Sequence, residues 1–114
     1  MFTASLPKLI LAAVAAGSIL ALAPVKAENA EIQLTYANGQ FEPKDVTAPA
    51  DTPFMIRVKN LDAKAMEFES KTLKVEKVIA AKSEAILKVR AMKPGRYEFF
   101  DEFNEKARGT INVQ

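Results

Sequence analysis

The sequence KPGRYEFFDEFNEKARGTINV, residues 93–113, carries the strongest indication of how the chain folds. Its Pro94-Gly95 pair is typical of a tight turn. In Tyr97-Glu98-Phe99 and in Ile111-Asn112-Val113 apolar and polar residues alternate, as they do in a strand with one buried face. These residues therefore predict two strands joined by a polar, acidic loop.

The same alternation recurs towards the N-terminus, between turn signals such as Asn38-Gly39 and Asn60-Leu61-Asp62. The further predicted strands are Glu31–Tyr36, a short segment near Val46, Phe54–Lys59, Met66–Glu69, Leu73–Ile79 and Ala85–Arg90. Seven or eight short strands at spacings of about 8 to 12 residues are typical of an all-β sandwich. We predict that the strands are antiparallel.

The first 27 residues have the three-part build of a secretory signal peptide. Lys8 supplies a positive charge, residues 9–23 are uncharged, and Val25-Lys26-Ala27 offers small side chains for cleavage. The uncharged run is shorter than the roughly 20 residues that span a bilayer. We expect cleavage after residue 27, which leaves residues 28–114 as one exported domain.

The composition excludes several kinds of chemistry, because the 114 residues include no Cys and no His. Disulfides, thiolate nucleophiles, imidazole bases and the usual zinc and copper ligands are therefore absent. The formal charge of +2 comes from Lys8 and Lys26 of the leader, so the predicted mature domain is neutral. A neutral domain gives no reason to expect nucleic acid as a partner.

Carboxylates are the remaining groups with metal chemistry. Glu67 and Glu69 are two residues apart on a predicted strand and project to the same face, while Asp101, Glu102 and Glu105 follow the aromatic strand. Oxygen ligands suit a hard cation such as iron, manganese or calcium better than copper. From spacing alone, a solvated strand face beside an acidic loop remains the alternative.

The stretch 93–113 resembles the last two strands and the ligand loop of a cupredoxin. In that family the loop carries Cys, His and Met as copper ligands, followed by a glycine. The residues at these four positions here are Asp101, Asn104, Ala107 and Gly109, and the first copper histidine would lie near Met66 or Glu67. The resemblance implies a Greek-key sandwich of seven to eight strands and, because the ligands are missing, no blue-copper centre.

A narrower resemblance covers nearly the whole predicted mature chain. The segments Phe41-Glu42-Pro43, Ala65–Ser70, Val75–Ile79 and Lys93–Tyr97 are similar to the cupredoxin-like domain of EfeO-type periplasmic iron-uptake proteins, including small stand-alone forms associated with iron permeases. In that family the glutamates at the positions of Glu67 and Glu69 are suspected metal ligands. Cysteines of some members would align with Phe41 and Asp101.

This resemblance implies a periplasmic protein that binds iron and hands it to a membrane permease. The expected ligands are Glu67, Glu69 and Asp101, with Glu102 or Glu42 as further ligands. Three carboxylates stabilise Fe(III) more than Fe(II), so the site would serve either a ferroxidase-like step or simple capture. Arg96 and Arg108 would abolish such a site if they neutralised its carboxylates.

Three other functions remain open. A metal-free docking module of the uptake complex is favoured by Phe100, which alternation places away from the core face, and by Phe103 in the loop. Copper(I) carriage would use Met55, Met66 and Met92, although alternation points Met66 inward. The cupredoxin resemblance also suggests a copper-binding electron-transfer partner.

Overall fold

The computed structural model describes residues 30–114, so the predicted signal peptide, residues 1–27, lies outside the described residues. Within the described part, all regular structure is β, in nine strands. The strands are β1 (Ala30–Ala37), β2 (Gln40–Glu42), β3 (Asp45–Ala48), β4 (Phe54–Asn60), β5 (Met66–Ser70), β6 (Val75–Ile79), β7 (Ser83–Val89), β8 (Gly95–Asp101) and β9 (Asn104–Val113). Over residues 30–114, no helix is long and apolar enough to cross a membrane.

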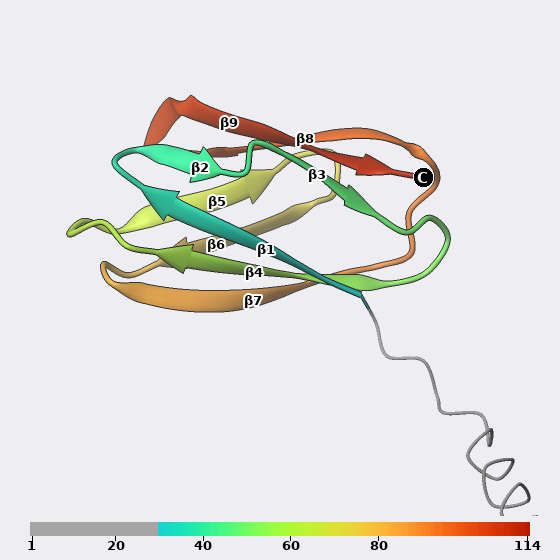
Figure 1. The fold of residues 1–114 in the computed structure, drawn as a ribbon, viewed down its shortest axis with the longest axis horizontal. Coiled ribbons are helices and arrows are strands. Elements are labelled where there is room, and N and C mark those ends of the chain that lie inside the picture. The colour runs from blue at the N-terminus through green and yellow to red at the C-terminus, as the bar shows by residue number, and fades with distance from the viewer. Residues whose placement is uncertain (1–29) are drawn as a thin grey trace, which may run out of the picture.

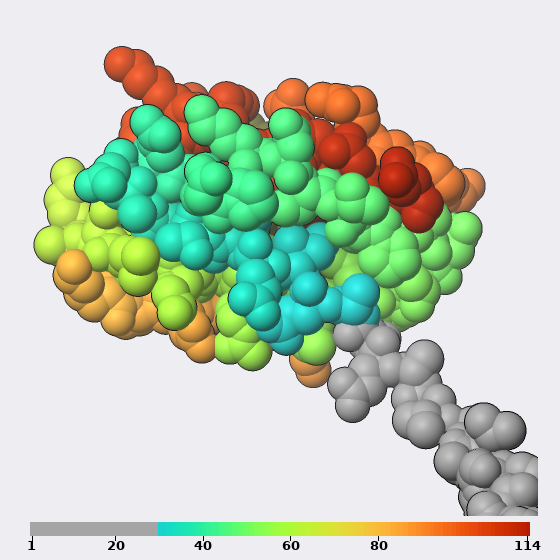
Figure 2. Space-filling model, in the orientation of Figure 1, coloured from blue at the N-terminus to red at the C-terminus, as the bar shows by residue number. Residues whose placement is uncertain are grey.

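The strands form the predicted sandwich of two sheets (Figure 1). One sheet has four strands in the order β2-β1-β4-β7, and the other has five in the order β3-β9-β8-β5-β6. β3 pairs with the last strand, β9, and in Figure 2 the green atoms that follow the blue N-terminal strands lie against the red atoms of the C-terminal strand. The predicted short segment near Val46 is β3, and one further short strand, β2, raises the strand number above the predicted seven or eight.

The prediction of purely antiparallel pairing was wrong. β1 pairs with β4 in parallel, and β3 pairs with β9 in parallel. Alternation along a strand shows which face is buried, but it is the same for a parallel and an antiparallel neighbour on a half-buried sheet. The local turns were predictable: Asn38 and Gly39 have φ values of 55° and 70°, as a two-residue hairpin turn between β1 and β2 requires.

The core between the sheets is built on aromatic rings. Phe41, Phe68 and Phe99 are fully buried, and the ring centroids of Phe41 and Phe99 lie 4.9 Å apart in an edge-to-face arrangement. Gly109 makes room for this cluster, because a Cβ there would lie 2.2 Å from the Phe99 ring and 2.6 Å from the Lys44 carbonyl oxygen. The rings of the interior are therefore closely packed against one another and against the backbone at Gly109.

A buried polar residue at the end of β4 joins the loop that follows it to the end of β6. The Asn60 side chain is fully buried, and its amide donates hydrogen bonds to the carbonyl oxygens of Lys64, Ile79 and Ala80 at 2.8, 3.2 and 3.1 Å. Its carbonyl oxygen accepts from the Asp62 N–H at 3.0 Å. Asn60 thereby holds together the end of the sandwich that carries the acidic loop.

Candidate metal-binding face

The outer surface of the five-stranded sheet gathers carboxylates from two adjacent strands. In β5 the residues alternate, so that Met66 and Phe68 enter the core while Glu67 and Glu69 project outwards. Glu76 of β6 lies directly opposite Glu69 in the antiparallel pair. Glu67, Glu69 and Glu76 each offer an oxygen within 4.8 Å of the others. This spacing allows three carboxylates to share one cation.

A fourth carboxylate lies beside these three. The backbone N–H of Glu102 donates to the carbonyl oxygen of Glu67 at 2.8 Å, which places Glu102 next to β5 just beyond the end of β8. The Glu102 carboxyl also acts on that of Glu69, whose pKa it raises. We call Glu67, Glu69, Glu76 and Glu102 the carboxylate face.

Crowding of like charges changes the acidity of this face. Burial raises the pKa of Glu67, and the charges of Glu76 and Glu102 raise it further. The pKa of Glu69 is raised first by its hydrogen bond with Glu102, then by burial and by the neighbouring carboxylates, while Lys71 opposes the rise. The four groups therefore repel one another, and a bound cation would relieve that repulsion.

The two arginines that could have neutralised the site do not pair with it. In the described part of the chain, the ion pairs are those of Arg57 with Glu31 and Glu84, on the outer face of the other sheet. The guanidinium of Arg108 stacks over the Phe100 ring, 4.9 Å from its centroid, and Arg96 donates to Asn112. Neither arginine therefore neutralises the carboxylate face.

Asp101, which the sequence grouped with Glu67 and Glu69, lies on the opposite side of the sheet. It pairs with Phe68, and only 2% of it is exposed. One carboxylate oxygen accepts from the Tyr36 hydroxyl at 2.5 Å, and the other accepts from the N–H groups of Glu67 and Phe103, each at 2.9 Å. The structure separates Asp101 from the two glutamates because pairing partners share a face, which sequence spacing does not reveal.

The remaining predicted ligands are divided in the same way. Glu102 belongs to the carboxylate face, whereas Glu42 is exposed on β2 in the other sheet and does not belong to the group of three. Glu76 was missed by sequence reasoning. The available signal was the pair of consecutive predicted strands Met66–Glu69 and Leu73–Ile79, because their antiparallel register brings Glu76 opposite Glu69.

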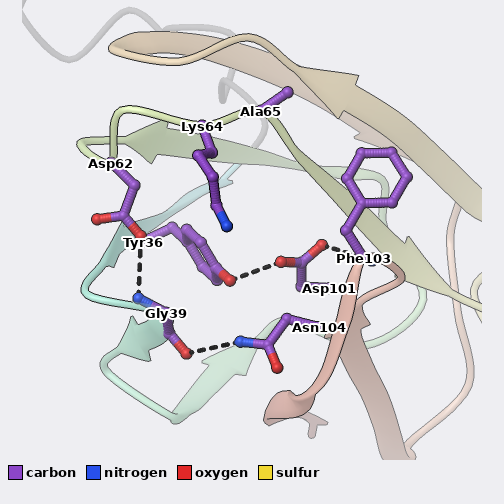
Figure 3. Close-up of a pocket in the computed structure, with 8 residues that line it drawn as sticks. All are labelled: Tyr36, Gly39, Asp62, Lys64, Ala65, Asp101, Phe103 and Asn104. Carbon is purple, nitrogen blue, oxygen red and sulfur yellow. Dashed lines mark hydrogen bonds between the residues drawn. The ribbon is translucent and has the colours of Figure 1, made fainter.

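The end of the sandwich at Asp101 carries a pocket of about 390 Å³ (Figure 3). Lys64 points from its rim towards the Tyr36 hydroxyl, and Phe103 stands beside its mouth. The Asp62 carboxylate accepts from the N–H groups of Asn38 and Gly39 at 2.6 and 2.9 Å, so it holds the β1–β2 turn. Burial and the bond to Asp101 raise the pKa of Tyr36 to about 12, which keeps its hydroxyl protonated as a donor.

This end lacks the side chains that bind copper in a cupredoxin. The residues that stand at the cupredoxin ligand positions are Asp101, Asn104 and Ala107, and Met66 or Glu67 lies near the position of the first histidine. Asp101 already accepts three hydrogen bonds. The Ala107 side chain has no atom that could bind a metal, and Met66 is fully buried in the core. Met92 is also part of the core. Met55 alternates with the buried residues of β4 and therefore projects from the outer face of its sheet. A soft cation therefore lacks a set of convergent ligands here.

The two phenylalanines proposed for docking differ in exposure. Phe100 lies on the outer sheet face, as alternation predicted, but only 7% of it is exposed because Arg108 and Lys71 cover its ring. Phe103 is 59% exposed. A contiguous apolar surface of both rings is therefore not formed.

Comparisons with known proteins agree with this architecture. Residues 9–113 match the family model described as a cupredoxin-like domain. The uncharacterized protein RP394 of Rickettsia prowazekii (strain Madrid E) is 32% identical over 84 residues, which cover 73% of this chain and 67% of that protein.

Solved structures share the fold at low sequence identity. The metal-binding domain of the Cu(I)-exporting P-type ATPase CopA of Streptococcus pneumoniae D39 has a TM-score of 0.68 at 17% identity, covering 77% of this chain and 90% of that one. Reduced auracyanin from Roseiflexus castenholzii has a TM-score of 0.65 at 13% identity, covering 77% and 99%. The two-sheet topology and the family match together show that this chain belongs to the cupredoxin-like domain family.

Proposed function

We propose that this protein binds iron on its carboxylate face, through Glu67, Glu69 and Glu76 with Glu102 beside them. The observation that supports this most directly is the convergence of three carboxylates within 4.8 Å without an ion-pair partner in the described part of the chain. Hard cations prefer such oxygen ligands. The relief of repulsion between Glu67, Glu69 and their neighbours adds to the binding free energy.

The physiological setting follows from the resemblance to periplasmic iron-uptake proteins and from the leader-like residues 1–27. We place the mature protein in the periplasm, where it captures iron and hands it to a membrane permease. Several anionic oxygens stabilise Fe(III) more than Fe(II), so binding lowers the reduction potential of the ion and favours its oxidation. The partly exposed position of Glu67 and Glu69 suits release to a partner.

The first test is a titration of residues 28–114 with Fe(II) and Fe(III). The double variant Glu67→Gln/Glu69→Gln should bind at least about tenfold more weakly, since affinity in such sites depends on the number of charged ligands. The control is Glu31→Gln/Glu84→Gln, which removes two carboxylates from the other sheet and should bind as the wild type does. Equal affinity of both double variants for iron would refute the carboxylate face as the site.

Docking to another uptake component is a second candidate, supported by Phe103. Its side chain is 59% exposed beside a pocket whose rim carries Lys64. An exposed aromatic next to a hollow is typical of a contact point for a partner protein. A Phe103→Ser variant that still binds iron but no longer transfers it to the permease would support this role, whereas unchanged transfer would contradict it.

A further inference from the structure

We propose that Asp101 is the positioning residue of the carboxylate face: it does not bind the cation, but fixes Glu67 and Glu102 through backbone hydrogen bonds. This inference rests on the proposed function of that face. It replaces the direct ligand role that the sequence indicated for Asp101 with an indirect one.

The register of the sheet explains why a side chain is needed at this point. β5 and β8 pair regularly at Glu69 with Phe100 and at Phe68 with Asp101, and the register of β8 against β9 shifts between Phe100 and Asp101. Such an irregularity interrupts the backbone ladder and leaves groups without a regular partner. Glu67 precedes Phe68 in β5 and lies where the regular pairing of β5 with β8 ends.

The Asp101 carboxylate continues the ladder there. Its Oδ1 accepts the N–H of Glu67 at 2.9 Å and the N–H of Phe103, also at 2.9 Å. The Glu67 carbonyl oxygen accepts the N–H of Glu102 at 2.8 Å. Both the N–H and the carbonyl oxygen of Glu67 are thus hydrogen-bonded to the segment that carries Glu102. These bonds fix the position of Glu67 relative to Glu102.

Tyr36 holds the carboxylate itself in place. Its hydroxyl donates to Asp101 Oδ2 at 2.5 Å from strand β1 of the opposite sheet (Figure 3). Both Tyr36 and Asp101 are almost completely buried, with 4% and 2% exposed. With Oδ2 bonded to Tyr36 and Oδ1 to two amides, no oxygen of Asp101 is directed to the outer face, where Glu67 and Glu69 project. The arrangement is that of an outer-shell group that orients ligands.

The experiment uses Tb(III) as a luminescent probe of residues 28–114 and compares four variants. Asp101→Asn keeps an oxygen that accepts the two N–H groups but removes the charge, whereas Asp101→Ala removes the acceptor. Glu67→Gln removes a proposed ligand, and Glu98→Gln removes a charge from β8 outside the carboxylate face. The affinity and the number of water molecules bound to Tb(III) are measured for each.

We expect Asp101→Asn to bind Tb(III) as Glu98→Gln does, with the wild-type number of bound waters. Asp101→Ala should lose about tenfold or more in affinity, the usual cost of removing an outer-shell partner. If Asp101→Ala does not fold, the comparison of Asp101→Asn with Glu67→Gln still decides between the two roles. Glu67→Gln should gain about one bound water in place of the lost ligand.

Two results would overturn the inference alone. One is a gain of a bound water in Asp101→Asn together with an affinity loss equal to that of Glu67→Gln, which would make Asp101 a ligand. The other is wild-type affinity in a folded Asp101→Ala, which would show that the two amides need no acceptor. Absence of Tb(III) and iron binding by the wild type would instead refute the proposed function, and this inference with it.

Discussion

At the scale of single residues, the chain uses its acidic side chains in two opposite ways. Asp101 is buried, and its two carboxylate oxygens accept three hydrogen bonds inside the protein. Glu67 and Glu69 lie on the surface beside other carboxylates, and their charges are destabilised. Only the second arrangement leaves oxygens free for a ligand.

Replacing Tyr36 by Phe tests the first arrangement. The variant leaves the buried carboxylate of Asp101 with one donor fewer, and a hydrogen bond to a charged group contributes about 1.5–3 kcal/mol. We expect a loss of that size in the free energy of unfolding at pH 7, measured by urea denaturation with an unchanged m-value. An unchanged free energy would mean that water replaces the hydroxyl without cost.

The hydrogen bond between Tyr36 and Asp101 also predicts how stability changes at alkaline pH. The pKa of Tyr36 is raised from 10.0 to about 12 in the folded protein. Its contribution to stability is therefore complete below pH 10 and is lost as the pH rises towards 12. The stability difference between the wild type and Tyr36→Phe should shrink over this interval, and a constant difference would contradict the assignment.

Glu69→Gln tests the second arrangement. A carboxyl with a raised pKa binds protons more tightly when folded, so its contribution to stability is greatest below its ordinary pKa and is lost as the pH rises through the folded value. We expect Glu69→Gln to melt at a higher temperature than the metal-free wild type at pH 7. The advantage should vanish near pH 4, and a variant less stable at pH 7 would contradict the repulsion.

At the scale of strands, alternation predicted most elements but not their partners. The strand of Met66 and Glu67 and the turn at Asn38-Gly39 are local features, and both are confirmed. The parallel pairing of β1 with β4 is not local. Sequence reasoning therefore found Glu67 and Glu69, which share a strand, and missed Glu76, which reaches them only through the β5–β6 register.

Gly109 shows how one strand depends on close approach of another. A Cβ there would lie 2.2 Å from the Phe99 ring and 2.6 Å from the Lys44 carbonyl oxygen, and a backbone atom cannot easily move. Gly109→Ala should cost ~1–3 kcal/mol or more through overpacking. In Gly95→Ala the added Cβ would meet the Tyr97 ring at 3.4 Å. Gly95→Ala is the control, and it should lose clearly less free energy of unfolding than Gly109→Ala when both are measured by urea denaturation.

At the scale of the whole molecule, the proposed cation site and the stability of the fold are separate. The core is a cluster of buried apolar side chains between two sheets, and at the end that holds copper ligands in a cupredoxin the buried side chains of Tyr36, Asp101 and Asn60 are fixed by hydrogen bonds. The carboxylate face lies outside this core. A cation bound there adds binding free energy to a domain that is already folded without it.

Chelation tests this separation. Protein treated with EDTA should keep its far-UV circular dichroism spectrum and unfold cooperatively in urea with the m-value of the cation-bound form, because both forms bury the same surface. Adding Fe(III) should raise the free energy of unfolding by about 2.7 kcal/mol when free iron is about 100 times Kd. The rise should be absent in Glu67→Gln/Glu69→Gln and retained in Glu31→Gln/Glu84→Gln. Loss of the folded spectrum in EDTA would show instead that the metal holds the sandwich together, and that the buried apolar core and the hydrogen bond between Tyr36 and Asp101 do not suffice.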